Sequence, residues 1–438
     1  MGDFIAQILA QGSSPLNAVW LIFLYGGWLI ILIAIAYGIY QIWLFNKQGA
    51  YAASVSYLTL AIDVPKQNEQ SPKAVEQIFA HLSGAHKPPD WYEKYFLGMF
   101  QLAYSFELIS INGKIQFIVR TPADYHDLVE AAVYAQYPDA VISEVNDYAK
   151  DNFFKVPNPE MDLWGTEFAI YNKDYFPIRT YPEFEHILSG ELKDPLTPML
   201  ETLGGLKNGE QVWMQLILTP TGNDWQKKGL EAMNKLSGIK VAPKKSKLAK
   251  NFGLIGGEIN SLYNETVKQA LSGFGESSAP ASKSKSDEAG MKLLAPHERS
   301  AVEAIQRKIS KIGYSVKWRV IYLGKKEIFS AARVITPLVG AIKQFNSSEF
   351  NGFAPQNAKY GIKVGHHPWA KKIKVKKQNK IMRAYRDRDR EIGHPGFILN
   401  TEELATIWHF PAILVKAPQV SKSEAKHAEP PSSLPLGR

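Results

Sequence analysis

The sequence predicts an α+β protein: an N-terminal transmembrane helix followed by tandem ferredoxin-like (split βαβ) α/β units with a disordered insertion. Three observations lead to this prediction. A long uncharged stretch lies near the N-terminus, two alternating runs flank Asn112-Gly113, and segments of helical periodicity alternate with segments of strand periodicity. A composition of 45% hydrophobic and 21% charged residues excludes collagen-like and wholly disordered chains.

The uncharged stretch predicts a membrane span. Residues Asn17 to Phe45 carry no charge over 29 positions. As a helix they measure about 43 Å, whereas the hydrocarbon core of a bilayer is about 30 Å thick. Tryptophan and tyrosine cluster at both ends, as in spans with interfacial aromatic belts. The run is too long for a cleaved signal peptide and lacks a basic n-region. Lys47 and Lys66 follow the span, so the positive-inside rule places the C-terminal bulk in the cytoplasm.

The first α/β unit is predicted over residues 50–150. An Asn-Gly pair between alternating runs is the strongest local signal for a hairpin. A loop rich in aromatic residues, His86 to Phe100, precedes that hairpin as an insertion. The expected order is β-α-β-β-α-β, with strands at Ser56 to Asp63, Phe106 to Ile111, Lys114 to Arg120 and Ala140 to Val145, and helices from Pro72 and Thr121.

The second unit is predicted over residues 160–362. Its clearest strand is Glu210 to Thr219, and a helix is expected from Asp224 to Leu236. A flexible Ser/Ala/Lys-rich insertion is expected at 239–292, because it has too little apolar surface to offset the entropy of ordering. Beyond it, we expect a strand at Ser315 to Leu323 and a helix at Glu327 to Phe345.

The remaining segments are a short N-terminal tail and a C-terminal region. The predicted boundaries are 1–16 for the tail, 17–46 for the transmembrane helix, 363–411 for a basic segment with a capped helix, and 412–438 for a Pro-rich tail. The chain has no cysteine. Disulfides, thiolate metal sites, iron-sulfur clusters and cysteine nucleophiles are therefore excluded, which fits a reducing compartment.

Positive charge is concentrated between Lys363 and Arg390. Eleven basic residues against two acidic ones account for the whole net charge of +9. The early part alternates like an edge strand and the later part has helical spacing. Three interpretations remain open: a solvated charged edge, a site for an acidic partner or anionic lipid, or a site for nucleic acid. The candidate phosphate-binding residues are Lys371, Lys372, Lys374, Lys376, Lys377, Lys380, Arg383, Arg386 and Arg388.

Signatures of catalysis are missing from the sequence. GxxxxGK[ST], GxSxG, HExxH, GxGxxG and EF-hand motifs do not occur. His366-His367 is interpreted as a loop pair, because adjacent residues of an extended segment point to opposite faces. We therefore expect a protein that is not an enzyme and that has no catalytic residue, cofactor or metal site.

A short segment near the C-terminus is distinctive. Phe397 to Pro411 reads FILNTEELATIWHFP, in which Asn400 or Thr401 caps a helix with an apolar stripe. This segment resembles the membrane-proximal region of type IV secretion and conjugation-type DNA-transport ATPases of small-genome bacteria, where a similar segment precedes a P-loop ATPase domain. The resemblance spans most of residues 50–435 and includes Ile115 to Ala140, Glu210 to Pro220, Leu294 to Gly324 and Gly340 to Pro355.

The resemblance implies a membrane subunit whose motor is a separate chain, because the ATPase would be expected to begin soon after Pro430 to Gly437. The leading hypothesis is a non-enzymatic, single-pass scaffold of the bacterial inner membrane that anchors or positions a P-loop ATPase. The alternative is a membrane-tethered nucleic-acid-binding or regulatory protein that acts without a motor. A homo-oligomer is left open. The candidate motor contacts are Glu402, Glu403, Leu404, Ile407 and Trp408.

Overall fold

The computed structural model describes Trp20, Phe23 and residues 27–65, 68, 70–184, 194–237, 295–366 and 368–411. The predicted N-terminal tail 1–16, the insertion 239–292 and the C-terminal tail 412–438 lie outside the described residues.

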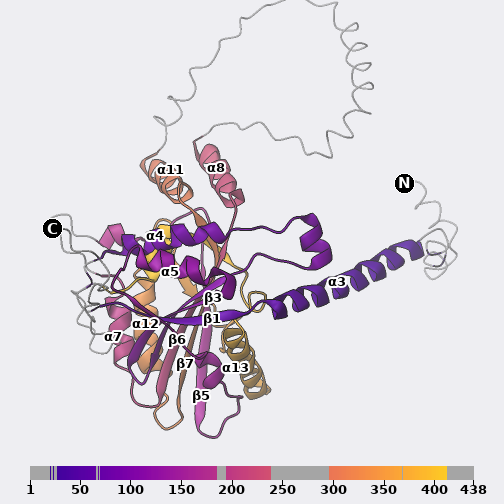
Figure 1. The fold of residues 1–438 in the computed structure, drawn as a ribbon. Helices are drawn as coiled ribbons and strands as arrows, with labels where there is room; N and C mark the ends of the chain where they lie inside the picture. Colours follow the sequence, from indigo (N-terminus) through magenta and orange to yellow (C-terminus); the bar gives the residue numbers. More distant parts are fainter. Residues whose placement is uncertain are drawn as a thin grey trace, which may run out of the picture.

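Strands and helices alternate along the described chain (Figure 1). The strands are β1 (Tyr57–Asp63), β2 (Tyr104–Ile111), β3 (Lys114–Pro122), β4 (Val141–Glu144), β5 (Met161–Ile170), β6 (Glu210–Pro220), β7 (Gly313–Lys325), β8 (Phe353–Pro355) and β9 (Phe397–Asn400). The α-helices are α3 (Trp28–Ser54), α4 (Pro72–Leu82), α5 (His126–Tyr134), α6 (Tyr148–Asp151), α7 (Thr197–Gly204), α8 (Asp224–Leu236), α11 (Pro296–Ile309), α12 (Ala331–Lys343), α13 (Ala370–Arg386) and α14 (Thr401–Ile407).

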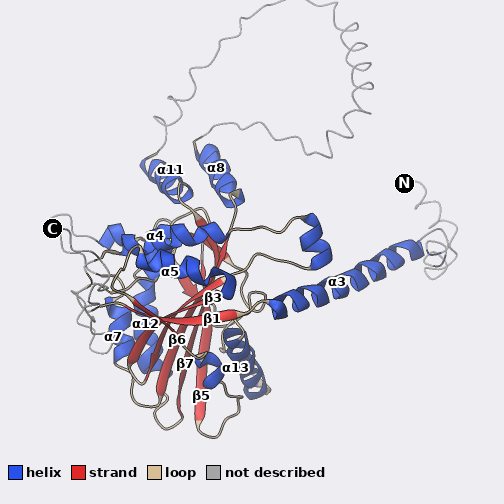
Figure 2. Ribbon diagram, in the orientation of Figure 1, coloured by secondary structure: helices blue, strands red, loops and turns tan. Residues whose placement is uncertain are grey.

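These strands form one nine-stranded antiparallel sheet (Figure 2). Its order is β4-β1-β3-β2-β6-β7-β5-β8, and β9 pairs with the start of β7. Strand β2 pairs with β6 along its whole length, from Tyr104 opposite Leu218 to Ile111 opposite Gln211. The two units predicted in series therefore share one sheet. Within each half the relative strand order is the same, β4-β1-β3-β2 in the first and β8-β5-β7-β6 in the second.

The two faces of the sheet carry different layers, because successive residues of a strand point to opposite faces. Helices α4, α5, α7, α12 and α14 pack on one face around a core that includes Phe106, Leu216 and Trp318. Helices α6 and α13 pack on the other face, against Trp213 and Ile321. One large core runs through both halves, so the halves are not separate hydrophobic units.

Local signals of the sequence are confirmed where they are strongest. Asn112 and Gly113 both have positive φ, 55° and 82°, and connect β2 to β3 as a two-residue turn requires. Helix α8 has the predicted bounds. Strand β6 extends the predicted strand by one residue, and β7 extends its prediction at both ends. Helix α12 begins at Ala331, after Ser330, whose hydroxyl accepts a hydrogen bond from Arg333 N.

One prediction for the C-terminal region is wrong. The residues from Lys372 to Lys376, which alternate as an edge strand would, belong to helix α13. Its apolar side packs on the sheet through residues such as Ile381 and Tyr385, and this packing outweighs the short alternation of lysines with Ile373 and Val375. The segment 363–411 is part of the α/β body, because β9 extends the sheet and α14 packs on α4.

Helix α3 projects from the α/β body and leads into β1 (Figure 1). The described helix begins at Trp28 and continues past the predicted end of the span, to Ser54. The last two turns of α3 therefore lie beyond the predicted span and connect the apolar part of the helix to the sheet.

Candidate membrane anchor and basic surface

Helix α3 exposes its apolar side chains on all sides. Its most hydrophobic 18-residue window has no buried residue, and only Leu44 is buried in the whole helix. Ile30, Ile33 and Ile39 have exposed fractions of 71%, 58% and 64%. A helix that is apolar all round needs an apolar environment. One N-terminal helix of this protein is thus long and apolar enough to cross a membrane.

Helix α13 has one basic, solvent-facing side. Six of the nine candidate residues are exposed along it, and none of the six forms an ion pair with a carboxylate of the described ranges: Lys371, Lys372, Lys374, Lys376, Lys380 and Arg383. The opposite side of the helix is buried through Gln378, Ile381 and Met382. The packing of that side fixes the six cations on one surface, which we call the basic face.

The other three candidates are engaged by other groups of the protein. Lys377 Nζ donates to the carbonyl oxygens of Ala358 at 2.5 Å and Lys363 at 2.9 Å. Arg386 is half-buried and forms an ion pair with Asp387 at 2.7 Å. These two side chains are less available to a ligand than the basic face.

Arg388 does not belong among the predicted phosphate-binding residues. Its side chain is buried, and Nε and Nη2 each lie 3.0 Å from an oxygen of Glu107. Nη1 lies 2.8 Å and 2.7 Å from the two oxygens of Asp147. A guanidinium saturated by two carboxylates has no free donor edge for a phosphate. Arg388 is therefore a structural residue.

Glu107 belongs to a row of polar side chains that crosses the centre of the sheet. Glu107 on β2 is opposite Gln215 on β6, Gln215 is opposite Arg319 on β7, and Arg319 is opposite Glu167 on β5. All four are buried beneath α13 and the loop that follows it. Gln215 Nε2 donates to Glu107 at 3.1 Å, and Arg319 Nε donates to Glu167 at 2.8 Å.

This polar row was not predicted from the sequence. Its signal is a charged or amide residue within the mostly apolar central stretch of each of four strands, as in FELI and WRVI. Arg319 of the row holds α13 to the sheet, because its Nη1 donates to Ala384 O at 3.0 Å. The neighbouring Lys317 holds the loop after α13, because its Nζ donates to the carbonyl oxygens of Arg390 and Ile392, both at 2.7 Å. These bonds satisfy buried polar groups, as a stable interior requires.

The ionisation of Glu107 is set by its partners. Burial by itself raises the pKa of a carboxyl group. The Arg388 charge, together with hydrogen bonds from Arg388, Ser105 and Tyr148, outweighs this effect, so the pKa of Glu107 lies below its usual value of 4.5. Glu107 is therefore a buried carboxylate that depends on Arg388.

The prediction that helix α14 contacts a motor is also wrong. All five predicted motor contacts, Glu402, Glu403, Leu404, Ile407 and Trp408, are buried. Trp408 packs edge-to-face on Phe106 with ring centroids 4.9 Å apart. Glu403 accepts hydrogen bonds from Lys308 Nζ at 3.0 Å and from Ile178 N at 2.9 Å. The capped helix and its apolar stripe were correctly predicted, but the stripe faces the core and not a partner.

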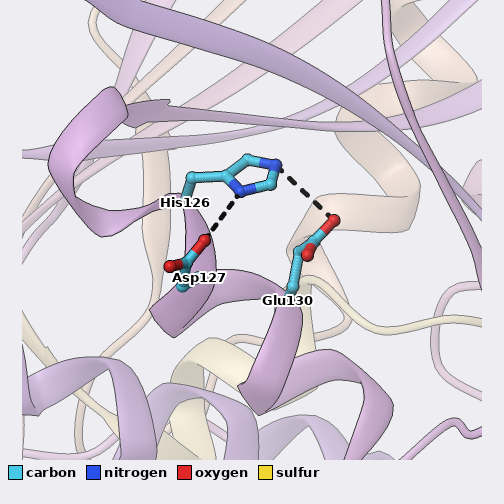
Figure 3. A group of neighbouring side chains, drawn as sticks. All are labelled: His126, Asp127 and Glu130. Carbon is cyan, nitrogen blue, oxygen red and sulfur yellow. Dashed lines mark hydrogen bonds and ion pairs between the residues drawn. The ribbon is translucent and has the colours of Figure 1, made fainter.

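One histidine and two carboxylates come together at the start of α5 (Figure 3). His126 Nδ1 lies 3.2 Å from Asp127 and Nε2 lies 3.5 Å from Glu130. These contacts join neighbours on one helix, and Asp127 is fully exposed, so the cluster is an ordinary surface group.

Two other histidines of the sequence lie elsewhere. His409 pairs with Asp194 at 3.0 Å inside the core, and His367 lies outside the described residues.

A cleft of about 750 Å³ lies where α3 meets the body. Residues Gln48 to Ala52 of α3 form one wall, and Arg120 and Arg390 line the other. The Arg120 guanidinium lies 4.2 Å from the Tyr57 ring centroid. Burial lowers the pKa of both arginines. Carboxylates of the 387–391 loop also line this cleft, so its charges are mixed.

Comparison with known proteins places the chain in a family. A search of curated proteins found no match. The family model described as a domain of unknown function, DUF8128, matches residues 64–423. The matched residues include helices α13 and α14 and every strand of the sheet except β1. Because this match covers well over half of the 438 residues, the protein belongs to the DUF8128 family.

Proposed function

We propose that this protein is a single-pass membrane subunit that holds a rigid α/β body at the cytoplasmic side of the bacterial inner membrane. The exposed apolar surface of α3 carries the proposal, because such a surface is stable only in lipid or against another apolar surface. Only two residues separate α3 from β1, so the body stays close to the membrane. Lys47 directly follows the apolar stretch on the side of the body, which favours a cytoplasmic body.

Within this proposal the body consists of two ferredoxin-like units joined edge to edge. The repeated strand order of the two halves, and the helix that follows the first and third strand of each half, support this interpretation. The join between β2 and β6 removes two exposed sheet edges and gives a broad scaffold.

The proposed partner is a type IV secretion or conjugation-type P-loop ATPase on a separate chain, as the resemblance implies. The buried α14 is not available as its contact. The basic face of α13 takes its place, because it is exposed and its cations lack carboxylate partners among the described residues. An acidic surface of the motor would complement it, and such complementarity accelerates association.

A pull-down from cell membranes tests this assignment. The variant Lys371→Glu/Lys372→Glu/Lys374→Glu/Lys376→Glu should lose an ATPase that the wild type retains. A control with the same change of net charge reverses four scattered, exposed lysines, Lys73, Lys114, Lys207 and Lys326. Equal recovery of the ATPase with both variants would contradict the assignment. Protease added outside intact cells should leave residues 47–438 uncut, and cleavage there would contradict the orientation.

Six cations on one helix also favour a second candidate, a membrane-tethered nucleic-acid-binding protein without a motor. The full chain in detergent would then retard DNA at low salt. The slope of log affinity against log salt should fall by about 0.9 for each phosphate contact that the charge reversals remove. Retention of DNA with no ATPase under any condition would favour this candidate.

A further inference from the structure

A loop beside α3 exposes an unusual group of apolar side chains. Within residues 87–98, which we call the aromatic loop, Trp91, Tyr92, Phe96 and Leu97 have exposed fractions of 68%, 56%, 43% and 46%. The rings also pack on each other, with Tyr92 stacked on Phe96 at 5.3 Å. Exposed rings that gather in one place mark an interaction surface.

The aromatic loop is fixed to α3 and runs alongside it (Figure 1). Trp43 and Phe96 meet edge-to-face at 6.2 Å, and Tyr40 Oη donates to Tyr95 O at 3.5 Å. Gly98 has a φ of 74°, and a Cβ atom there would lie 2.6 Å from the backbone nitrogen of Gln48. A side chain at position 98 would therefore push the loop away from the helix.

These contacts place the loop at a defined level of the helix. They involve Tyr40, Trp43 and the backbone at Gln48, around the point where the apolar stretch ends and Lys47 brings the first charge. Trp43 and Lys47 are separated by about 6 Å along the axis. In a bilayer spanned by α3, this level is the headgroup region, where tryptophan and tyrosine are most stable.

We propose that the aromatic loop is a second membrane-contacting element, which lies in the interface of the leaflet where α3 leaves the bilayer. The proposal rests on the membrane anchoring proposed above. Lipid is the favoured occupant because the exposed rings adjoin the apolar surface of α3, which itself needs lipid. Lys87 and Lys94 of this loop are balanced by Asp90 and Glu93, so the exposed rings, and not a net charge, are the basis for contact with lipid. Two points of contact would fix the tilt of the body relative to the membrane.

The lack of cysteine makes a direct test possible. Single variants Trp91→Cys and Leu97→Cys, labelled with an environment-sensitive NBD group, are reconstituted as full chains into vesicles of phosphatidylcholine and phosphatidylglycerol. Ile35→Cys in α3 reports on the anchor. Tyr171→Cys is the control, because Tyr171 is 53% exposed and follows β5, five strands away from β1.

We expect labels at 91 and 97 to shift to shorter wavelength and to lose intensity when lipids carry a nitroxide near the headgroup, with no change at 171. If the labels at 91 and 97 emit as they do in water, while the label at 35 emits as it does in lipid, the aromatic-loop proposal alone is overturned. A shielded label that nitroxide lipids do not quench would mean a protein partner or second copy, and would also overturn it. A label at 35 that reads water would overturn the anchoring itself.

Discussion

Removal of Arg388 should leave a buried charge without its partner. In Arg388→Met the methionine replaces most of the side-chain volume but none of the four charged contacts to Glu107 and Asp147. Asp147 is near the surface and can rehydrate, whereas Glu107 has no exposed area. Glu107 keeps hydrogen bonds from Ser105 at 2.6 Å, Tyr148 at 2.8 Å and Gln215 at 3.1 Å, but none of these donors carries the positive charge that a buried carboxylate needs.

The expected loss is about 3–5 kcal/mol of unfolding free energy, the range for breaking one side of a buried ion pair. For a body of this size that corresponds to a fall in melting temperature of about 5–8 °C. The pKa of Glu107 lies below its usual value, so its contribution is present above the unfolded pKa and is lost as pH falls through the folded pKa. In the variant the Arg388 charge no longer offsets the effect of burial, so the pKa of Glu107 rises. The difference between wild type and variant should therefore shrink as the pH is lowered from 7 towards 4.

Thermal unfolding of the full chain in detergent, followed by tryptophan fluorescence, measures this difference. Trp213 contacts the Tyr148 ring at 5.1 Å and reports on the site. Arg383→Met removes an exposed arginine from the same helix and should change stability by less than about 0.5 kcal/mol. The double variant Glu107→Gln/Arg388→Met should lose less than the sum of the single losses. Additive losses, or a loss below about 1 kcal/mol for Arg388→Met, would refute the reasoning.

Three further perturbations probe the core, the polar row and the loop after α13, each by thermal unfolding in detergent. Trp408→Ala should cost about 3–5 kcal/mol because the ring is buried among other aromatic rings, and a loss under about 1 kcal/mol would mean that α14 is not a core helix. Burial and the nearby Arg319 charge lower the pKa of Lys317 from 10.5 to about 8, so the stability of the wild type relative to Lys317→Met should rise between pH 8 and pH 10.5, and a flat difference contradicts this. Gly393→Ala should cost more than about 1 kcal/mol, because φ is 107° and a Cβ atom would lie 2.0 Å from Glu167 Oε1. Gly365→Ala, with open space around it, should be neutral.

Local parts of the fold could be predicted because their causes are local. The Asn112-Gly113 turn needs two residues that tolerate positive φ, and the sequence supplies them between two alternating runs. The capping box of α14 lies within four residues, where Asn400 Oδ1 accepts from Glu403 N at 2.9 Å. Such signals locate elements, but they carry no information on which strand of one half pairs with the other half.

The candidate site was predicted less well, because exposure depends on distant residues. An apolar stripe on a helix predicts a contact face but does not say whether the core or a partner covers it. For α14 the covering surface includes α4, which lies more than 300 residues away along the chain. Arg383 and Arg388 lie in the same basic segment and cannot be distinguished from the sequence, yet only Arg388 lies next to Glu107.

The sequence by itself determined that an uncharged stretch longer than a bilayer precedes an α/β body, and that the excess of positive charge falls between residues 363 and 390. The tertiary structure alone decided that both halves share one sheet, that α14 is core, and that Glu107 and Arg388, 281 positions apart, neutralise each other. The physical reason is the distance along the chain over which each interaction acts. Hydropathy and turn chemistry act between near neighbours, whereas desolvation and ion pairing depend on whichever surfaces the completed fold brings together.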